Sequence, residues 1–250
     1  MPLSDAQRRR YARHFVLGDI GEAGQEKLLD SHVAILGCGG LGSPAAGYLA
    51  AMGVGSLTLI DGDRVELSNL QRQILFETAD IGQPKVDAAA NRIQEINPDI
   101  HSHTRFETLT AENAAELIEG ADVVIDGSDN FTTRIALHDA CAQANKPLIY
   151  AAISGFDALL TTFKSHMGAP HPCLHCFMPD TPTREVTCAQ EGIAGALAGM
   201  VGSQQALESV KELLGIGASL SGRILRYDGL RGKWSESVLT KDPLCPFCNK

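Results

Sequence analysis

The chain has no long hydrophobic run, and its basic side chains are outnumbered by acidic ones. No apolar stretch approaches the roughly 20 residues that span a bilayer, and the N-terminus carries charge where a secretory signal is apolar. Lysine and arginine total 21 against 30 aspartates and glutamates, a formal net charge of −9. Because phosphate backbones bind basic faces, this balance disfavours nucleic acid as the main partner. We expect a soluble cytoplasmic protein that binds neither nucleic acid nor membrane.

Over the first 150 residues, short apolar strands alternate with helical segments. The strands are expected at 32–36, 56–60, 101–106, 122–126 and 147–150, and the helices between them at 44–52, 86–96, 111–118 and 132–144. This alternation predicts an α/β, Rossmann-like nucleotide-binding fold with a mostly parallel sheet and helices on both faces.

The pattern changes after about residue 150. Segments 159–163 and 223–227 read as strands, and the turn Asp228-Gly229 leads to a further strand around Trp234. We expect an antiparallel C-terminal extension of the same sheet, a loop over 166–190 and a long helix over 192–214. The predicted organisation is a single domain over 1–250, with a helical arm at 1–30, a nucleotide-binding part at 31–150, and the extension, crossover loop and metal site at 151–250.

A glycine-rich turn follows the first expected strand and opens the helix after it. Glycines 37, 39, 40 and 42 allow a tight turn and close approach to a phosphate, with helix N–H groups facing the anion. About 20 residues later, Asp61 ends the next strand, where a carboxylate can hold ribose hydroxyls. The alternative is a turn that serves only strand–helix packing. The motif indicates an adenine nucleotide but does not separate NAD from ATP.

Two charged residues stand where packing does not require them. Lys85 lies in the first turn of a helix, against the helix dipole, which suggests that it faces an anion rather than bulk solvent. Asp129 follows the strand at 122–126, where ligands bind in open α/β sheets, so it is placed to hold Mg²⁺ on phosphates. The alternative role for Asp129 is a helix N-cap, but Asn130 can take that position.

The loops at the strand ends therefore offer two carboxylates, one guanidinium and one ammonium. The guanidinium is Arg72, in the run Ser68-Asn69-Leu70-Gln71-Arg72-Gln73. Hydride transfer needs no such set. A carboxylate that attacks a polyphosphate does, because two anions repel and charge grows on the leaving pyrophosphate.

Four of the seven cysteines form two Cys-x-x-Cys pairs, Cys173/Cys176 and Cys245/Cys248. In a cytosolic chain such pairs indicate metal rather than disulfide, and four thiolates predict a closed tetrahedral structural Zn²⁺ site. The alternatives are free thiols, an iron–sulfur cluster or a redox pair. We expect Cys38 and Cys141 to be packing residues.

These motifs together resemble the MoeB/ThiF family, the bacterial relatives of ubiquitin-activating enzymes. The matching stretches run in the family's order and cover nearly the whole chain: Arg10 to Arg13, Gly37 to Gly42, Ser68 to Gln73, Gly82 to Lys85, Ser128 to Asn130 and both cysteine pairs. Three positions depart from the family: Phe156-Asp157 replaces a common Gly-Gln, Ser128 replaces a threonine, and His14 replaces a glutamine. The first bears on how a carrier docks rather than on the chemistry.

The resemblance implies an enzyme that uses ATP and Mg²⁺ to adenylate the C-terminal glycine of a ubiquitin-like sulfur carrier ending in Gly-Gly. It places Gly40 at the phosphates and Asp61 at the ribose, gives Asn69, Arg72 and Lys85 to the phosphates, and gives Mg²⁺ to Asp129. The remaining members of the implied nucleotide site are Gly37, Gly39, Gly42, Asp63, Ser68, Leu70, Gln71 and Asn130.

The resemblance also implies partners. Arg13 matches an arginine that reaches the neighbouring subunit's site, which implies a homodimer. Cys188 matches a loop cysteine that links covalently to the activated carrier in some members, or else has no required role. A separate protein is expected to donate the sulfur. The carrier can be the small subunit of molybdopterin synthase, the thiamine sulfur carrier or another; the sequence leaves this open.

Two other readings of the sequence compete with adenylation. The glycine turn and Asp61 alone fit an NAD-dependent oxidoreductase. A non-catalytic zinc scaffold would fit the cysteines, but the intact charged set speaks against it.

Overall fold

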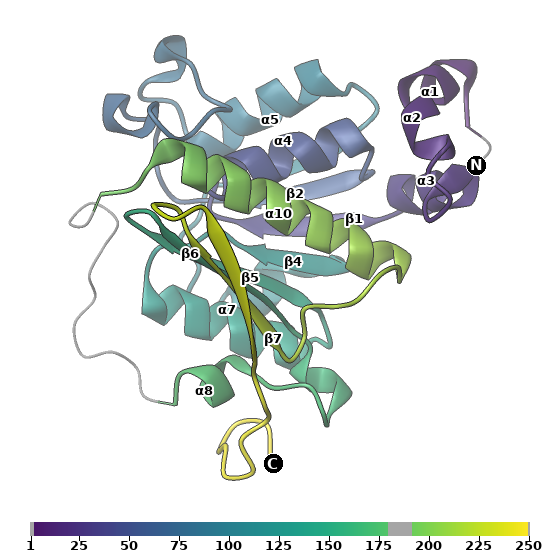
Figure 1. Ribbon diagram of the computed structural model, residues 1–250. Coiled ribbons are helices and arrows are strands. Elements are labelled where there is room, and N and C mark those ends of the chain that lie inside the picture. Colours follow the sequence, from purple (N-terminus) through teal and green to yellow (C-terminus); the bar gives the residue numbers. More distant parts are fainter. Residues whose placement is uncertain (1–2, 180–191, 250) are drawn as a thin grey trace.

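The computed structural model describes residues 3–179 and 192–249, which contain one eight-stranded sheet (Figure 1). Its strand order is β3-β2-β1-β4-β5-β6-β7-β8. Strands β1 to β5 pair in parallel and β5 to β8 pair antiparallel. The strands are β1 (His32–Leu36), β2 (Ser56–Ile60), β3 (His101–Arg105), β4 (Val123–Asp126), β5 (Leu148–Ser154), β6 (Asp157–Phe163), β7 (Arg223–Asp228) and β8 (Lys233–Val238). The predicted α/β fold with an antiparallel extension is confirmed.

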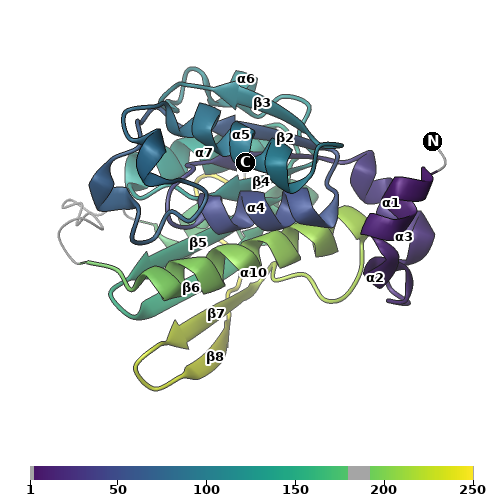
Figure 2. The same cartoon turned by 90° about the horizontal axis from the view of Figure 1, so that it is seen from above.

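The central strands are apolar on both faces because helices cover both sides of the sheet. Helices α4 (Gly42–Met52), α5 (Lys85–Ile96) and α10 (Gly195–Leu214) lie over one face, and α6 (Ala114–Leu117) and α7 (Phe131–Gln143) lie over the other (Figures 1 and 2). Successive strand side chains therefore enter different cores. In β1, Ile35 packs with the α4 and α10 side, whereas Ala34 packs with the α6 and α7 side.

Small residues let α10 approach the glycine turn closely. A Cβ on Gly202 would overlap the carbonyl oxygen of Leu41, which lies between the turn and α4. Ala198, one turn earlier on α10, lies against Gly40. The long helix of small residues thus supports the turn that precedes α4.

The N-terminal arm, which the sequence predicts to be helical, forms three helices. They are α1 (Asp5–Arg10), α2 (Ala12–Phe15) and α3 (Gly21–Leu29). Ser4 and Gln7 form a capping box that starts α1. The first break falls at Tyr11, whose buried hydroxyl accepts a hydrogen bond from Asn97 Nδ2 at 2.8 Å. Figure 2 places the arm at one end of the sheet, by the C-terminal end of α10.

The segment predicted as a loop over 166–190 contains local helical structure. It begins in the 3₁₀ turn η3 (Ser165–Met167) and includes the short helix α8 (Leu174–Phe177) inside the first cysteine pair. Two further 3₁₀ turns, η1 (Leu67–Asn69) and η2 (Thr78–Asp80), lie between β2 and α5. Cys188 lies outside the described residues. In the described part of the chain, no helix combines the length and the apolar character needed to cross a membrane.

Candidate functional site

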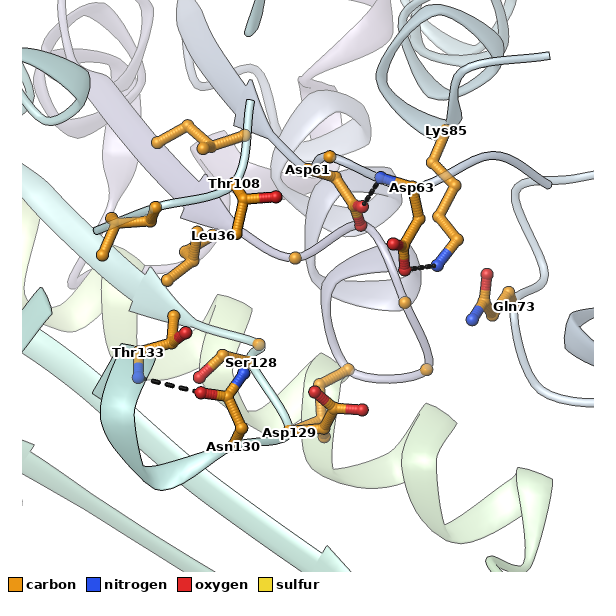
Figure 3. Close-up of a pocket in the computed structure, with 18 of the residues that line it drawn as sticks. Leu36, Asp61, Asp63, Gln73, Lys85, Thr108, Ser128, Asp129, Asn130 and Thr133 are labelled. Atoms are coloured by element: carbon orange, nitrogen blue, oxygen red, sulfur yellow. Dashed lines mark hydrogen bonds and ion pairs between the residues drawn. The ribbon is translucent and has the colours of Figure 1, made fainter. Parts of the chain in front are cut away.

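A polar pocket opens at the carboxyl ends of β1, β2 and β4 (Figure 3). β1 lies next to both β2 and β4 in the sheet. After β1 the chain crosses to β2, and after β4 it crosses to β5, so the connections from these two adjacent strands run in opposite directions and leave a crevice between them. Ligands of open α/β sheets bind at such a crevice. The lining comes from the glycine turn, the end of β2, the loop around η1, the start of α5, residues 107–109 and the β4–α7 loop.

Two of the four glycines in the turn are fixed by backbone packing. Gly37 has φ +83°, and a Cβ there would lie 2.7 Å from the carbonyl oxygen of Gly127. A Cβ on Gly42 would overlap the carbonyl oxygen of Gly37. Gly39 and Gly40 are different, because a Cβ on either meets only side-chain atoms, the nearest at 3.3 Å. Their lack of a side chain leaves the pocket floor open.

Backbone donors are exposed on that floor. Among residues 3–179 and 192–249, the amides of Gly39, Gly40 and Leu41 donate no hydrogen bond. Helix α4 starts directly after them, and no side chain caps its N-terminus. Unpaired N–H groups at a helix N-terminus bind anions, and phosphate is the usual one.

Asp61, at the end of β2, braces the glycine turn. Its Oδ2 accepts the Cys38 N–H at 2.8 Å, and its Oδ1 accepts the Asp63 N–H at 2.8 Å. Burial raises the pKa of Asp61, and the nearby Lys85 ammonium opposes that rise. Each carboxylate oxygen has a second lone pair, so Asp61 still has acceptors for a ligand hydroxyl.

Lys85 enters the pocket from the first residue of α5. Its Nζ donates to Asp63 Oδ2 at 2.8 Å, and its side chain is 8% exposed against 73% for Asp63. The sequence predicts that this lysine faces an anion, and the structure supplies one in Asp63. The ammonium is buried beside the pocket, while its partner carboxylate stands in solvent (Figure 3).

The loop around η1 contributes Asn69, Arg72 and Gln73 to the lining. Arg72 Nη1 donates to the carbonyl oxygen of Ser68 at 3.1 Å, and no carboxylate pairs with this guanidinium in the described part of the chain. Asn69 Oδ1 accepts the Glu66 N–H at 3.2 Å. Gln73 is 3% exposed, and its Oε1 has no partner among the described residues.

Three residues of the same loop that the sequence assigns to the nucleotide do not line the pocket. Leu70 packs against the core under α4. The Gln71 carbonyl oxygen lies against Gly195 at the start of α10. Ser68 is exposed, and its Oγ donates to Glu66 Oε2. The motif thus alternates between residues that face the pocket and residues that hold the loop in place.

The β4–α7 loop presents one unpartnered carboxylate. Asn130 Oδ1 accepts the Thr133 N–H at 2.9 Å and caps α7, as the sequence predicts. Asp129 is exposed, lines the pocket, and forms no hydrogen bond or ion pair with any residue that the structure describes. The cap role is therefore taken, and the Asp129 carboxylate is available to a ligand.

Sequence reasoning misses several polar residues of the pocket, among them Gln73 and Arg134. Gln73 closes the motif that carries Arg72, and that position was its only signal. Arg134, a buried arginine on α7, lines the pocket without belonging to any motif. Its guanidinium bonds the Tyr150 hydroxyl at 2.7 Å and the Ser128 carbonyl oxygen at 2.8 Å. No sequence spacing announces these contacts, because Tyr150 comes from β5.

Arg13 lies far from the pocket of its own chain. It is exposed on α2, in the arm that packs near the C-terminal end of α10. The other end of α10 meets Gln71 beside the pocket. The 20 residues of α10 span about 30 Å at a rise of about 1.5 Å per residue. Arg13 therefore does not act on the pocket within one subunit.

The four cysteines of the two Cys-x-x-Cys pairs come together. The Sγ–Sγ distance is 3.6 Å for Cys173–Cys176, 3.5 Å for Cys173–Cys245 and 3.5 Å for Cys176–Cys248. All four sulfurs lie within 4.8 Å of one another. Tetrahedral zinc with bonds of about 2.3 Å separates its sulfur ligands by about 3.8 Å, so the cluster fits that ion.

Two histidines support the cysteine cluster, His138 from α7 and His175 from α8. His138 Nε2 accepts the Leu174 N–H at 3.1 Å, and Asp139 Oδ1 contacts His138 Nδ1 at 2.9 Å and His175 Nε2 at 2.8 Å. The rings of His138 and His175 lie beside Phe247, between the second pair of cysteines. Burial lowers the pKa of His138, which favours the neutral ring that this acceptor role requires.

The two single cysteines that the structure describes are buried. Cys38 is 1% exposed under the glycine turn, and Cys141 is 1% exposed on α7. Burial raises the pKa of both thiols, which disfavours the reactive thiolate. Both are packing residues, as the sequence predicts.

Comparison with known proteins gives one consistent result. The ThiF family profile matches residues 11–247. The chain is 41% identical over 243 residues to a "Sulfur carrier protein adenylyltransferase" of Thermus thermophilus, covering 96% of this chain and 90% of that protein. It is 42% identical over 246 residues to a "Sulfur carrier protein ThiS adenylyltransferase" of Escherichia coli, covering 98% of this chain and 97% of that protein.

A solved structure shares the fold. The crystal structure of E. coli MccB with MccA-N7isoASN superposes with a TM-score of 0.83 at 21% identity, covering 99% of this chain and 76% of that chain. At this identity the likeness establishes the architecture only.

Proposed function

The chain belongs to the ThiF family, and we propose that it is an ATP-dependent adenylyltransferase for a ubiquitin-like sulfur-carrier protein. It activates the C-terminal glycine carboxylate of the carrier as an acyl-adenylate and releases pyrophosphate. One observation carries the assignment of the reaction to the pocket. The amides of Gly39 to Leu41 and the carboxylate of Asp129, which have no partner among the described residues, share one cavity with the cations of Arg72 and Lys85.

Different residues of the pocket bind different parts of ATP. The backbone amides of Gly39 to Leu41 donate hydrogen bonds to phosphate oxygens, and the remaining lone pairs of Asp61 accept hydrogen bonds from the ribose hydroxyls. Asn69, Arg72 and Lys85 lie on the side of the pocket where negative charge must be offset. Gly37 and Gly42 hold the turn, and Asp63 keeps the Lys85 ammonium in place.

Two anions must meet in this reaction. A carrier carboxylate oxygen attacks the α-phosphorus of ATP, an O–P bond forms, and the bond to the bridging oxygen breaks as pyrophosphate leaves. Charge builds on that oxygen during the displacement. Arg72 and Lys85 are fixed cations beside the phosphates and stabilise this charge more than they stabilise the ground state.

Asp129 fits a magnesium ligand. Its carboxylate is exposed to the pocket and unpartnered in the described structure, and Mg²⁺ prefers one or two carboxylates together with substrate phosphates. When bound there, Mg²⁺ neutralises phosphate charge. Asn130 serves this site by fixing the start of α7 next to Asp129.

The cysteine cluster fits structural zinc. Its four thiolates complete a tetrahedral shell, so no position remains for a substrate. We propose that Zn²⁺ at Cys173, Cys176, Cys245 and Cys248 fastens the C-terminal segment to the loop around α8. Thiols paired for metal also agree with a reducing, cytoplasmic location.

The proposed assembly is a homodimer in which Arg13 serves the neighbouring subunit's pocket. The place of Arg13 supports this, because the arm lies by the end of α10 that is away from the pocket of its own chain, and α10 is about 30 Å long. Cys188 lies outside the described residues; its thiolate attacks the carbonyl carbon of the acyl-adenylate, a thioester to the carrier forms, and the acyl–phosphate bond breaks as AMP leaves. A separate donor protein supplies the sulfur. The carrier is the small subunit of molybdopterin synthase, the thiamine sulfur carrier or another ubiquitin-like sulfur carrier.

ATP–pyrophosphate exchange tests the proposal. We expect exchange that depends on a purified carrier ending in Gly-Gly and that stops when the terminal glycine is deleted. Assaying the candidate carriers one at a time identifies the partner. Tight NADH binding without ATP binding would instead favour the oxidoreductase reading of the glycine turn.

A further inference from the structure

The loop that carries Asp129 is fixed on both sides of that residue. Asp126 Oδ1 accepts the Ser128 N–H at 2.9 Å and the Ser128 hydroxyl at 2.6 Å. On the other side, Asn130 caps α7 through Thr133. Figure 3 shows Ser128, Asp129 and Asn130 at the rim of the pocket, with the hydrogen bond from Thr133 to Asn130 drawn. Among the described residues, the place of the Asp129 side chain is set by its neighbours in the loop and not by hydrogen bonds or ion pairs of its own.

Arg134 completes this support from inside the protein. It is 7% exposed. Its Nη2 donates to the Ser128 carbonyl oxygen at 2.8 Å, and its Nη1 donates to the Tyr150 hydroxyl at 2.7 Å. The guanidinium carbon also lies 5.0 Å from the centroid of the Tyr150 ring. One side chain therefore joins the loop, helix α7 and strand β5.

The charge of Arg134 suits its place. Asp126 is fully buried, and its Oδ2 has no hydrogen-bond partner in the described part of the chain. A buried carboxylate is costly unless a positive charge lies nearby. Burial raises the pKa of Asp126, and the nearby Arg134 guanidinium opposes that rise and offsets the repulsion between Asp126 and Asp129. With a neutral residue at position 134, the positive charge that offsets the repulsion between the Asp126 and Asp129 carboxylates would be lost.

We propose that Arg134 is a positioning residue that holds the Ser128 carbonyl, and through it the Asp129 carboxylate, in the geometry that binds a divalent cation on the nucleotide phosphates. The inference rests on the ATP site proposed above. Arginine is required because its planar fork bonds two acceptors at once, whereas lysine offers a single point charge. Tyr150 acts indirectly: its hydroxyl accepts a hydrogen bond from Arg134 Nη1 and so fixes the guanidinium.

Binding of Mn²⁺ tests the proposal without turnover. Electron paramagnetic resonance counts free Mn²⁺ in the presence of the whole protein and α,β-methylene-ATP, an analogue that cannot transfer its adenylyl group because a methylene replaces the bridging oxygen. We expect Arg134→Gln to raise the Mn²⁺ dissociation constant at least tenfold, Arg134→Lys to raise it less, and Tyr150→Phe to raise it about threefold. Analogue binding in EDTA should stay within about twofold of wild type. Arg231→Gln, at an exposed arginine in the β7–β8 turn, is the matched control.

Three results would overturn the proposal. Wild-type Mn²⁺ affinity in a folded Arg134→Gln protein removes the positioning role. An equal loss of analogue affinity in EDTA means that Arg134 contacts the nucleotide directly. If Arg134→Gln does not fold, unchanged Mn²⁺ affinity in Tyr150→Phe decides against the proposal. If the wild-type protein binds Mn²⁺ and the analogue but shows no exchange with any carrier, only the proposed function is refuted. If it does not bind the analogue at all, both the proposed function and the role of Arg134 are refuted.

Discussion

The strand-end pocket and the cysteine cluster differ in how their polar groups are satisfied. In the pocket, the amides of Gly39 to Leu41, the Gln73 oxygen and the Asp129 carboxylate have no partners among the described residues. In the cluster, the four sulfurs contact one another, and the Asp242 N–H donates to Cys176 Sγ at 3.4 Å. Buried or half-buried polar groups without partners are uncommon in folded proteins.

The difference separates a site for a visiting molecule from a site for a resident ion. Pocket groups come from many segments and converge on open space, so a large substrate can enter and leave. Cluster groups come from two short loops and converge on each other, with room for one small ion. Substitutions in the pocket should therefore change turnover with little effect on stability, and substitutions in the cluster should do the reverse.

The largest expected effect is that of Asp129→Ala. We expect ATP–pyrophosphate exchange with Mg²⁺ to fall about 10³-fold, because a metal ligand is lost at the phosphates. The thermal midpoint should stay within about 2 °C, since the side chain is exposed and unpartnered in the described structure. Asp99→Ala, at an exposed aspartate outside the pocket, is the control. Normal exchange by Asp129→Ala would remove the metal role.

Arg72→Ala should come next, with a loss of about 10² in kcat/KM for exchange, the usual value for one fixed charge at a transition state. Arg64→Ala is a suitable comparison, because Arg64 is a nearby arginine that bonds the Gly82 carbonyl and lies over Phe106, outside the pocket. Equal rates for the two variants would show that the guanidinium of Arg72 does not face the reacting phosphates.

The cluster should respond in stability. Metal analysis of the purified protein should find about one Zn²⁺ per chain, and Cys245→Ser should release it. Since metal binding couples to folding, we expect that variant to melt at a lower temperature, while exchange per folded molecule falls less than about threefold. Iron in place of zinc, or a loss of exchange as large as that of Arg72→Ala, would contradict the division between the two sites.

Cys188→Ala should have the smallest effect on exchange, about twofold or less, because the thiol acts only after the adenylate has formed. Mass spectrometry should show that the covalent adduct with the carrier disappears. Exchange that collapses in a folded Cys188→Ala protein would refute this order of steps.

The sequence predicts the strands well where a local pattern determines them. The mainly apolar runs His32–Leu36 and Ser56–Ile60 coincide with β1 and β2, because strands buried on both faces are rich in apolar residues. The expected helix over 111–118 shrinks to Ala114–Leu117, which packs as a single turn against α7. Helix length there depends on tertiary packing that no local pattern encodes.

The candidate site divides in the same way. Gly37, Asp61 and Lys85 could be found because each stands at a strand end or a helix start. Arg134 could not, since its value comes from Tyr150 and Ser128, which only the folded sheet brings to it. The motif around Arg72 was located as a unit, but which of its members face the pocket depends on the path of η1.

Gly202 does not line the pocket, but it affects the shape of the pocket. Any side chain there would press on the Leu41 carbonyl and on Pro44, and so would tilt the first turn of α4. The position of the backbone amides that face the phosphates therefore depends partly on α10, which has no side chain at Gly202. Gly202→Ala adds one methyl group on the side of the glycine turn that faces away from the pocket, and we expect it to displace the backbone that binds the nucleotide.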